Sequence, residues 1–268
     1  MAERFKDQVV IVTGGGRGIG RAVALEFAAE GAVLLLGGRR MDALQTSVLE
    51  CREAGGRAES IKCDVAVEED LQGIVLRAMD HYGRIDVLVN NAGVVTGGRL
   101  DEIAAEDVRR ITDVNIWAPV RLSQIALPHM RAAKSGTIVN ISSIAGRVGM
   151  PYHATYCASK YALRGFSEAL RRELRRDGVH VMAVYPGVTA TDLLEGVEID
   201  GLGVPIATAA QVGRAVRRGV ERGQNDVFIG LGESMFAGWN DMAPWAVDMG
   251  VDLMRERFLR AVQRQRTT

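Results

Sequence analysis

Short runs of apolar and β-branched residues alternate along the chain with longer segments in which apolar residues recur at helical spacing. The short runs are mostly apolar, as strands that are covered on both faces must be. They predict strands at Val9–Thr13, Val33–Leu36, Glu59–Lys62, Val87–Asn90, Thr137–Ile141, Val179–Tyr185 and Val227–Ile229. The amphipathic segments between them, such as Arg21–Glu30 and Met41–Glu53, predict helices. Strand–helix alternation of this kind predicts an α/β fold with a doubly wound parallel sheet.

The chain beyond Gly230 departs from this alternation. It is rich in large apolar side chains, and from Val247 to Val262 these recur at helical spacing with Arg and Glu between them. Such a stripe favours a helix packed in the core or at a subunit interface. The alternative is a hydrophobic surface helix that touches membrane lipids. We therefore expect a single domain with a helical C-terminal tail.

Length and composition narrow the function further. A chain of 268 residues suits one large domain, and its 33 basic and 33 acidic residues create no overall field that favours nucleic acid. No apolar stretch approaches about 20 residues, so no membrane-spanning helix is expected. The histidines and cysteines lack metal-ligand spacing, so we expect no metal site. The charged N-terminus lacks a secretory signal, which leaves a cytoplasmic protein as the default expectation.

A glycine-rich segment, Thr13–Gly20, joins the first predicted strand to the first predicted helix. Glycines allow positive φ in such a turn and let the backbone approach a pyrophosphate without a Cβ clash. The N-terminus of the helix adds free N–H groups and the positive end of its dipole. The loop alone is a weak signal, but its place between strand and helix indicates a dinucleotide site of the Rossmann type.

The end of the second predicted strand bears on which dinucleotide is bound. A site for NAD places a carboxylate here to bind the ribose 2′-hydroxyl, and the segment Gly37–Arg40 has none. It offers Arg39 and Arg40 instead, with Arg17 nearby in the glycine loop. Guanidinium groups suit a 2′-phosphate, so the sequence predicts NADP(H) rather than NAD(H). The alternative is that all three arginines are solvated surface residues.

Further motifs along the chain resemble those of the short-chain dehydrogenase/reductase family, in the order of that family. They are a TGxxxGxG segment, an NNAG segment, a helix asparagine, a serine ahead of a YxxxK motif, and a Pro-Gly segment followed by a threonine. In this sequence they lie at Thr13–Gly20, Asn90–Gly93, Asn115, Ser143, Tyr156–Lys160, Pro186–Gly187 and Thr191. The resemblance spans roughly residues 6–230, and several motifs in order are far more specific than any one of them.

The resemblance implies an oxidoreductase that moves a hydride between NADP(H) and a carbonyl or secondary alcohol. It implies a dinucleotide-binding and catalytic domain over residues 1–230, with residues 231–268 as its helical extension. The implied catalytic residues are Asn115, Ser143, Tyr156 and Lys160. The residues expected to bind the cofactor are Gly14, Gly16, Arg17, Gly18, Ile19, Gly20, Arg39, Arg40, Asp64, Val65, Asn91, Ala92, Gly93, Tyr156, Lys160, Pro186, Gly187 and Thr191.

The Tyr156–Lys160 pair suits the proton transfer that such a reaction needs. Hydride transfer to a carbonyl leaves an alkoxide, which a phenol can protonate. A lysine one helical turn away favours the phenolate, so we expect the pKa of Tyr156 to lie below its usual value of about 10. Ser143, just beyond the fifth strand, can hydrogen-bond the substrate oxygen, with Ser142 as the competing candidate. The resemblance implies that Asn115 holds a water linking Lys160 to solvent.

The substrate is expected to bind against the segments that follow the strand ends. Their side chains are mainly apolar, which favours a hydrophobic carbonyl or alcohol. The candidate substrate residues are Val95, Ile144, Met150, His153, Leu193 and Leu194. The glycines between Asp192 and Ile206 suit a mobile lid. By analogy with the family, we expect a homodimer or homotetramer formed through two long helices, around Asp107–Arg131 and Tyr156–Arg176.

Two other functions are compatible with the same residues. One is an epimerase or dehydratase of the same fold, although that group usually carries a longer C-terminal substrate domain. The other is a non-catalytic NADP(H)-binding sensor, but a sensor has no need of the proton-transfer residues.

Overall fold

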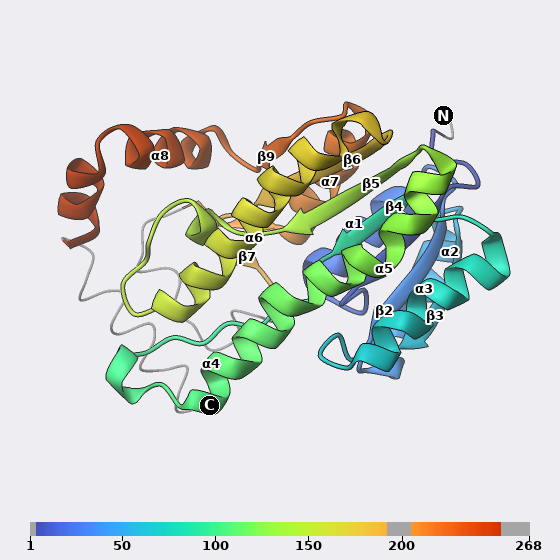
Figure 1. Ribbon diagram of the computed structural model, residues 1–268, viewed down its shortest axis with the longest axis horizontal. Coiled ribbons are helices and arrows are strands. Elements are labelled where there is room, and N and C mark those ends of the chain that lie inside the picture. Colours follow the sequence, from blue (N-terminus) through green and yellow to red (C-terminus); the bar gives the residue numbers. More distant parts are fainter. Residues whose placement is uncertain (1–3, 192–204, 253–268) are drawn as a thin grey trace.

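Seven parallel strands form the central sheet, in the order β3-β2-β1-β4-β5-β6-β9 (Figure 1). The computed structural model describes residues 4–191 and 205–252. The strands are β1 (Val9–Thr13), β2 (Val33–Gly38), β3 (Arg57–Lys62), β4 (Val87–Asn90), β5 (Gly136–Ile141), β6 (Val179–Tyr185) and β9 (Asp226–Phe228), and β7 (Thr189–Ala190) pairs separately with β8 (Ala207–Thr208). The strand order reverses between β1 and β4, and such a switch point opens a crevice at the carboxyl ends of the strands.

Helices cover both faces of the sheet because successive residues of a strand point to opposite sides. Val10 and Val12 of β1 lie in one apolar cluster, whereas Val9 and Ile11 lie in the other. The helices over the first cluster are α1 (Gly18–Ala28), α2 (Met41–Glu53) and α7 (Ala209–Glu221), and those over the second are α3 (Glu68–Tyr82), α5 (Ala118–Ala133) and α6 (Ala154–Glu173). The predicted α/β fold with a doubly wound parallel sheet is confirmed.

All seven predicted strands are present, but several of their ends differ from the prediction. The strand β2 continues through Gly37 and Gly38, which pair with Ile61 and Lys62 of β3. The last strand starts at Asp226, one residue before the predicted start. Backbone pairing with a neighbouring strand sets these ends, and the side-chain pattern does not report it.

The first of the two long predicted helices is built from three parts. It consists of α4 (Ala105–Thr112), a π-helical turn at Asp113–Trp117, and α5. The π-helical turn contains Asn115, and such turns are frequent at functional sites. The second long helix is α6, which is continued by a short 3-10 turn at Leu174–Arg176. Two further 3-10 turns lie at Leu100–Glu102 and Ile144–Gly146.

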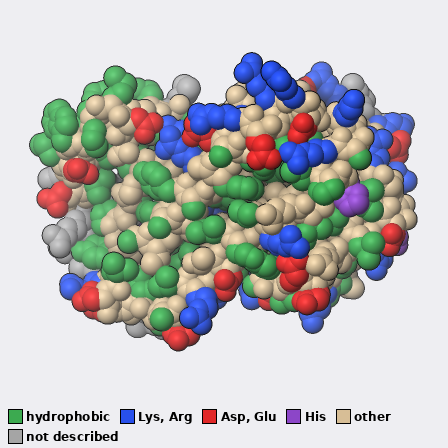
Figure 2. Space-filling model, in the orientation of Figure 1, with side chains coloured by type: hydrophobic (Ala, Val, Ile, Leu, Met, Phe, Trp, Pro, Cys, Tyr) green, Lys and Arg blue, Asp and Glu red, His purple; other side chains and the backbone are tan. Residues whose placement is uncertain are grey.

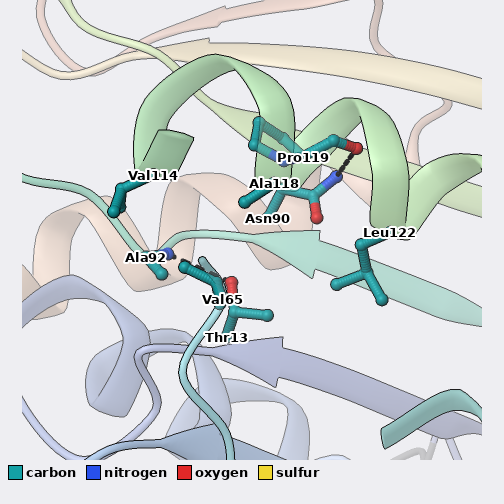
Figure 3. Close-up of a pocket in the computed structure, with 8 residues that line it drawn as sticks. All are labelled: Thr13, Val65, Asn90, Ala92, Val114, Ala118, Pro119 and Leu122. Carbon is teal, nitrogen blue, oxygen red and sulfur yellow. Dashed lines mark hydrogen bonds between the residues drawn. The ribbon is translucent and has the colours of Figure 1, made fainter. Parts of the chain in front are cut away.

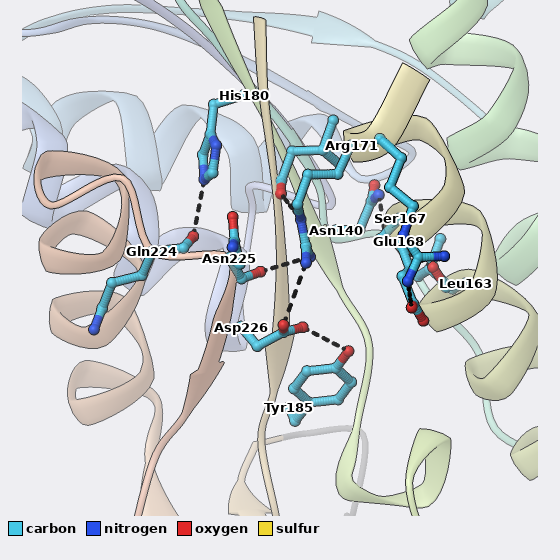
Figure 4. A network of polar contacts seen from close by, with 12 residues as sticks. Asn140, Leu163, Ser167, Glu168, Arg171, His180, Tyr185, Gln224, Asn225 and Asp226 are labelled. Atoms are coloured by element: carbon cyan, nitrogen blue, oxygen red, sulfur yellow. Dashed lines mark hydrogen bonds and ion pairs between the residues drawn. The ribbon is translucent and has the colours of Figure 1, made fainter. Parts of the chain in front are cut away.

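A row of buried polar side chains crosses the sheet beneath α5 and α6. Asn90 at the end of β4 donates to Ser123 Oγ at 3.2 Å and to Asn140 Oδ1 of β5 at 2.8 Å. Asn140 in turn donates to Ser167 Oγ of α6 at 2.8 Å, and Ser167 donates to the Leu163 carbonyl (Figure 4). The row therefore ties both strands to the two long helices that cover them.

The C-terminal segment is helical as far as the structure describes it, from α8 (Leu231–Met242) through residues 244–252. Ala237 and Val247 are buried, but the outer face is apolar, as Figure 2 shows over α8. Its large exposed side chains are Met235, Phe236, Trp239, Met242, Trp245 and Met249. The remainder of the predicted stripe, residues 253–262, lies outside the described residues. Among the described residues, no helix is long and apolar enough to span a membrane.

Candidate active site

The glycine loop and the turn after β4 are joined at the switch point through Thr13 and Asn91. The Thr13 hydroxyl accepts hydrogen bonds from the backbone N–H groups of Asn91, at 3.0 Å, and Ala92, at 3.1 Å. The Asn91 side chain donates to the carbonyls of Thr13, at 2.9 Å, and Gly14, at 3.3 Å. Two segments that were expected to bind the cofactor are therefore fixed to each other.

The backbone of the loop requires glycine at several positions. Gly14 and Gly18 have φ values of +66° and +53°, in the left-handed region that side chains disfavour. A Cβ on Gly20 would lie 2.3 Å from the Gly14 carbonyl oxygen. Gly16 faces Ala43 of α2, and Gly18 faces the Thr191 side chain, where a Cβ would lie 3.3 Å from Thr191 Cγ2.

This geometry fits a dinucleotide. Arg17 is extended and precedes α1, so the first N–H groups of that helix are not bonded within it. A helix N-terminus with a side-chain-free loop before it is a suitable anchor for a pyrophosphate. Thr191 adds a hydroxyl from the far side of the loop, beyond β7. The predicted residues Gly14, Gly16, Arg17, Gly18, Ile19, Gly20 and Thr191 thus lie on one side of the crevice.

The predicted residues for the adenosine end lie at the ends of β2 and β3. Arg39 and Arg40 are exposed directly after β2, and neither forms an ion pair with another of the residues that the structure describes. Asp64 follows β3, and its carboxylate accepts from the backbone of Ala66 at 3.1 Å. Val65 is buried at a small hollow that Figure 3 shows beside the end of β4. The hollow is lined by Thr13, Val65, Asn90, Ala92, Val114, Ala118, Pro119 and Leu122.

Asn115 and Lys160 approach each other across the turn after β4. Asn115 is almost fully buried, accepts from the backbone N–H of Val94 and donates to its carbonyl, both at 2.9 Å. It also donates to Ser159 Oγ of α6 at 3.1 Å. A Cβ on Gly93 would lie 3.5 Å from Asn115 Oδ1 and 3.6 Å from Lys160 Nζ, so both polar atoms flank the same piece of backbone.

The ammonium group of Lys160 is buried beside Tyr156. Lys160 is only 5% exposed, and its Nζ donates to the Ile141 carbonyl at the end of β5, at 3.0 Å. The same atom lies 5.7 Å from the centre of the Tyr156 ring. Burial lowers the pKa of Lys160 to about 8, because the charged form loses its hydration.

Tyr156 lies beside Ser143. Burial raises the pKa of Tyr156 to about 12, and the neighbouring Ser143 hydroxyl acts in the opposite direction. The expectation that Lys160 holds this pKa below its usual value is therefore wrong for this structure. The physical reason is that desolvation of the phenolate dominates, while the ammonium group points to the Ile141 carbonyl.

The structure separates the two competing serines. The Ser142 hydroxyl is buried and donates to the Lys160 carbonyl at 3.0 Å, which fastens β5 to α6. The Ser143 hydroxyl caps the following 3-10 turn, accepting from the Ala145 N–H at 3.1 Å. Of the two hydroxyls, that of Ser143 is the one that acts on the pKa of Tyr156.

The segment after β6 lies against the Ser143 turn. The Pro186 carbonyl accepts from the Ile144 N–H at 2.9 Å and from the Ser143 hydroxyl at 3.4 Å. Gly187 follows, and a Cβ there would lie 2.1 Å from Oε1 of Glu233 in α8. A larger residue at position 187 would displace the Glu233 carboxylate from its present place.

The predicted substrate residues lie on loops around Tyr156. Val95, Ile144 and Met150 are half-buried on the loops after β4 and β5. His153 immediately precedes α6, with its Nδ1 3.1 Å from the Pro151 carbonyl, and burial lowers its pKa. The predicted residues Leu193 and Leu194, and most of the predicted lid at 192–206, lie outside the described residues.

Several residues of this site were not singled out from the sequence. Thr13 stood inside the glycine motif, but its hydroxyl gave no sign that it would hold the turn after β4. Ser159 stood inside the YxxxK motif and was read only as a spacer. Glu233 had no signal at all, because it belongs to the tail beyond the motifs. Within the described residues, no group of His, Cys, Asp and Glu could hold a metal ion.

The chain is similar in sequence and in fold to proteins that are already known. A family model described as short chain dehydrogenase matches residues 8–200. The 11-beta-hydroxysteroid dehydrogenase-like protein 4A of Arabidopsis thaliana is 37% identical over 84% of this chain and 77% of its own length. The short-chain reductase NovJ of Streptomyces niveus is 37% identical over 78% of this chain and 82% of its own length. A short-chain dehydrogenase/reductase from Burkholderia phymatum, solved with NAD, aligns with a TM-score of 0.81 and 25% identity over 90% of this chain and 95% of its own.

Proposed function

Because the chain belongs to the short-chain dehydrogenase/reductase family of oxidoreductases, we propose that it transfers a hydride between NADP(H) and a carbonyl or secondary alcohol. The observation that carries this proposal is the arrangement of three side chains: Ser143 lies beside Tyr156, and Lys160 is buried with its Nζ 5.7 Å from the centre of the same ring. These three side chains lie past the carboxyl ends of the strands, where open α/β sheets bind ligands.

Tyr156 is the general acid when the carbonyl is reduced. The nicotinamide cofactor, when bound, supplies the hydride to the carbonyl carbon and accepts it again in the reverse direction. The phenol of Tyr156, whose pKa is raised to about 12, holds its proton at neutral pH and so is ready to donate it to the substrate oxygen. Ser143 donates a hydrogen bond to that oxygen and steadies the charge that develops on it.

Lys160 supplies positive charge and protons behind Tyr156. Its ammonium favours any state in which the phenol has given up its proton. Asn115 holds the Val94 turn with both ends of its amide, and its Oδ1 flanks Gly93 together with Lys160 Nζ. We propose that a water at this point continues the proton path from Lys160 toward solvent.

The preference for NADP(H) rests on Arg39 and Arg40. Both guanidinium groups are exposed at the end of β2 and have no acidic partner within the described ranges, so both are available to a 2′-phosphate. The Burkholderia phymatum relative was solved with NAD, so the fold alone does not decide between the two cofactors. The cationic side chains after β2 favour NADP(H).

The proposed substrate is a hydrophobic ketone or secondary alcohol. Val95, Ile144 and Met150 present mainly apolar surface on the loops around Tyr156, with His153 beside them. The Arabidopsis relative is named after a hydroxysteroid dehydrogenase, which supports a bulky apolar substrate. We propose that residues 1–230 carry the cofactor site and the catalytic residues, and that residues 231–268 extend the same domain.

We also propose that the protein forms a homodimer or homotetramer in the cytoplasm. Trp117, just before α5, and Tyr161 on α6 leave large apolar side chains exposed on the two long helices. Aromatic residues are enriched at subunit interfaces. The cysteines Cys51, Cys63 and Cys157 are free, as in a reducing compartment. Light scattering after size exclusion tests the assembly, and a monomer at micromolar concentration would contradict it.

A screen of ketones and alcohols with both cofactors tests the main proposal. We expect NADPH absorbance to fall with a subset of apolar ketones as the alcohol forms, and NADH to be used less well. In Tyr156→Phe we expect carbonyl reduction to drop by about a hundredfold or more while NADPH still binds. Near wild-type turnover in that variant would contradict the proposal. Tight NADPH binding with no turnover of any compound would favour the sensor, and isomerised product without net cofactor consumption would favour the epimerase.

A further inference from the structure

The helix α8 contacts two turns: the Ser143 turn, which the proposed function assigns to the reaction, and the Pro186–Gly187 turn, which we expect to bind the cofactor. At its N-terminal end, Glu233 Oε2 accepts from the backbone N–H groups of Ile229 and Gly230, both at 3.1 Å. The other oxygen of the same carboxylate lies against Gly187, where no Cβ would fit. This end of α8 therefore packs on the Pro186–Gly187 turn.

At its other end, α8 binds Arg147 in two ways. Asp241 accepts from Arg147 Nη2 at 2.6 Å, and the Asn240 side chain donates to the Arg147 carbonyl at 3.0 Å. Arg147 comes directly after the 3-10 turn that Ser143 caps. Asp241 also lies 4.0 Å from Arg164 of α6, one helical turn beyond Lys160. One carboxylate thus faces both the Ser143 turn and the helix that carries Tyr156.

Arg147 also contacts the ends of β6 and β9. Its guanidinium carbon lies 5.6 Å from the centre of the Tyr185 ring and 5.7 Å from that of Phe228. The two rings are stacked at 5.0 Å, and Tyr185 donates its hydroxyl proton to Asp226 at 3.0 Å (Figure 4). Because Tyr185 immediately precedes Pro186, the position of this stack sets where the Pro186–Gly187 turn begins.

The side chain of Arg147 is 16% exposed and that of Asp241 is 44% exposed, so the pair lies partly in solvent and Arg147 is its more buried partner. Without the Asp241 carboxylate the guanidinium loses its charged partner, and we expect the Arg147 side chain to move. The amides that would report such movement are those of residues 145–148. They donate to Ser143 Oγ, the Ser143 carbonyl and the Ile144 carbonyl within the turn itself.

We propose that α8 is a positioning element for the reaction, in which the Arg147–Asp241 pair holds Ser143 at the distance from Tyr156 that catalysis needs. Glu233 does the same for the Pro186–Gly187 turn at the other end of the helix. This inference rests on the proposed function of Ser143 and of that turn. Neither Arg147 nor Asp241 needs to touch the substrate, so both act through the residues that they hold.

The test is Asp241→Asn, which keeps the size of the side chain and removes its charge. We expect kcat to fall by at least about tenfold, because small displacements of positioned groups are costly, with the KM for NADPH changed less than about twofold. In the double variant with Ser143→Ala, Asp241→Asn should lower kcat little below the value for Ser143→Ala alone, because both substitutions act on the same contact. Arg147→Lys keeps the charge but loses the planar stack. Its kcat should lie between that of the wild type and that of Arg147→Met.

The matched control is Asp177→Asn, which breaks a pair of similar length with Arg131, 2.7 Å, away from the site. It should leave kcat unchanged. Hydrogen exchange of residues 145–148 gives a readout besides activity, and we expect faster exchange there in Asp241→Asn.

Wild-type kcat and unchanged exchange in Asp241→Asn would overturn the inference. Full additivity with Ser143→Ala would also overturn it. If the wild-type protein reduces no ketone, the proposed function fails, and the exchange rates alone still decide whether α8 holds the Ser143 turn.

Discussion

Gly20 and Asn91 lie so close that no side-chain carbon fits between them. A Cβ on Gly20 would be 2.5 Å from Asn91 Nδ2, and the same amide bonds the carbonyls of Thr13 and Gly14. The first helix, the glycine loop and the turn after β4 are therefore in direct contact at one point. The phosphate end of the dinucleotide site depends on this contact, since it sets where α1 begins.

Gly20→Ala should damage both stability and cofactor binding. The added methyl group must push the loop away from Asn91, and overpacking of this kind typically costs about 1–3 kcal/mol of unfolding free energy. We expect NADPH affinity to fall by at least about tenfold, because the displaced N–H groups no longer converge on the phosphates. Urea unfolding and a fluorescence titration with NADPH measure the two effects. Gly73→Ala is the control: it lies in α3 with open space around it, and there alanine should stabilise by up to about 1 kcal/mol.

The two neighbouring serines should respond differently to alanine. Ser143→Ala removes the hydroxyl beside Tyr156 that we assign to the substrate oxygen, so we expect kcat to fall by about a hundredfold with little change in NADPH binding. Ser142→Ala removes the bond to the Lys160 carbonyl, so we expect a loss of about 1 kcal/mol in unfolding free energy and a smaller change in kcat. Steady-state kinetics and urea unfolding of both variants check this. The assignment of Ser143 is lost if the two kinetic effects are reversed.

Lys160 should make the stability of the protein depend on pH. Its pKa is about 8 in the folded protein and about 10.5 when unfolded, so between these values the unfolded chain binds more protons. The contribution of Lys160 to the unfolding free energy therefore rises as the pH increases from about 8 to 10.5. Below about pH 8 the full cost of burying the charged amine is present. Lys160→Met removes the effect. The unfolding free energy of the wild type, relative to this variant, should increase over that window by up to about 3 kcal/mol.

Urea unfolding at intervals between pH 7 and 10.5 measures that difference. Lys62→Met, which removes an exposed positive charge at the end of β3, controls for the loss of charge alone. If the difference in unfolding free energy between the wild type and Lys160→Met stays constant with pH, burial does not lower the pKa of Lys160.

Arg39 and Arg40 should discriminate between the two dinucleotides. Replacing both by alanine removes two guanidinium groups that we assign to the 2′-phosphate, and each charge-assisted bond is worth about 1.5–3 kcal/mol. We expect the KM for NADPH to rise at least about tenfold, with the KM for NADH nearly unchanged. Initial rates with both cofactors give the answer. The double variant Arg175→Ala/Arg176→Ala lowers the net charge equally at a remote place, and an equal loss in both double variants would refute the assignment.

The order of strands and helices followed from the sequence because each buried strand must be apolar on both faces. Where the predicted elements differ from the structure, the cause is backbone pairing or helix geometry. The second strand was predicted to end at Leu36, yet Gly37 and Gly38 also pair with β3. The stretch around Asn115 read as continuous helix, and hydrophobic spacing carries no mark of a single π-helical turn.

The site was predictable where it depends on local motifs and not where it depends on distant contacts. Ser143, Tyr156 and Lys160 lie near one another, because Ser143 lies on the connection from β5 to α6 and the other two lie on α6 itself. The prediction that the pKa of Tyr156 is lowered was wrong, because residue spacing does not report desolvation. The contact between Arg147 and Asp241 joins residues 94 positions apart, so no local pattern could indicate it.

The buried row from Ser123 through Asn90 and Asn140 to Ser167 has a consequence for how the chain reaches this structure. A slip of one residue between β4 and β5 would turn one of the two amides toward the opposite face and break the hydrogen bond that joins them in an apolar interior. Misaligned sheets are therefore penalised before any ligand is present. Apolar strands that could otherwise associate in more than one alignment are thus restricted to the single alignment that brings α6 over the end of β5.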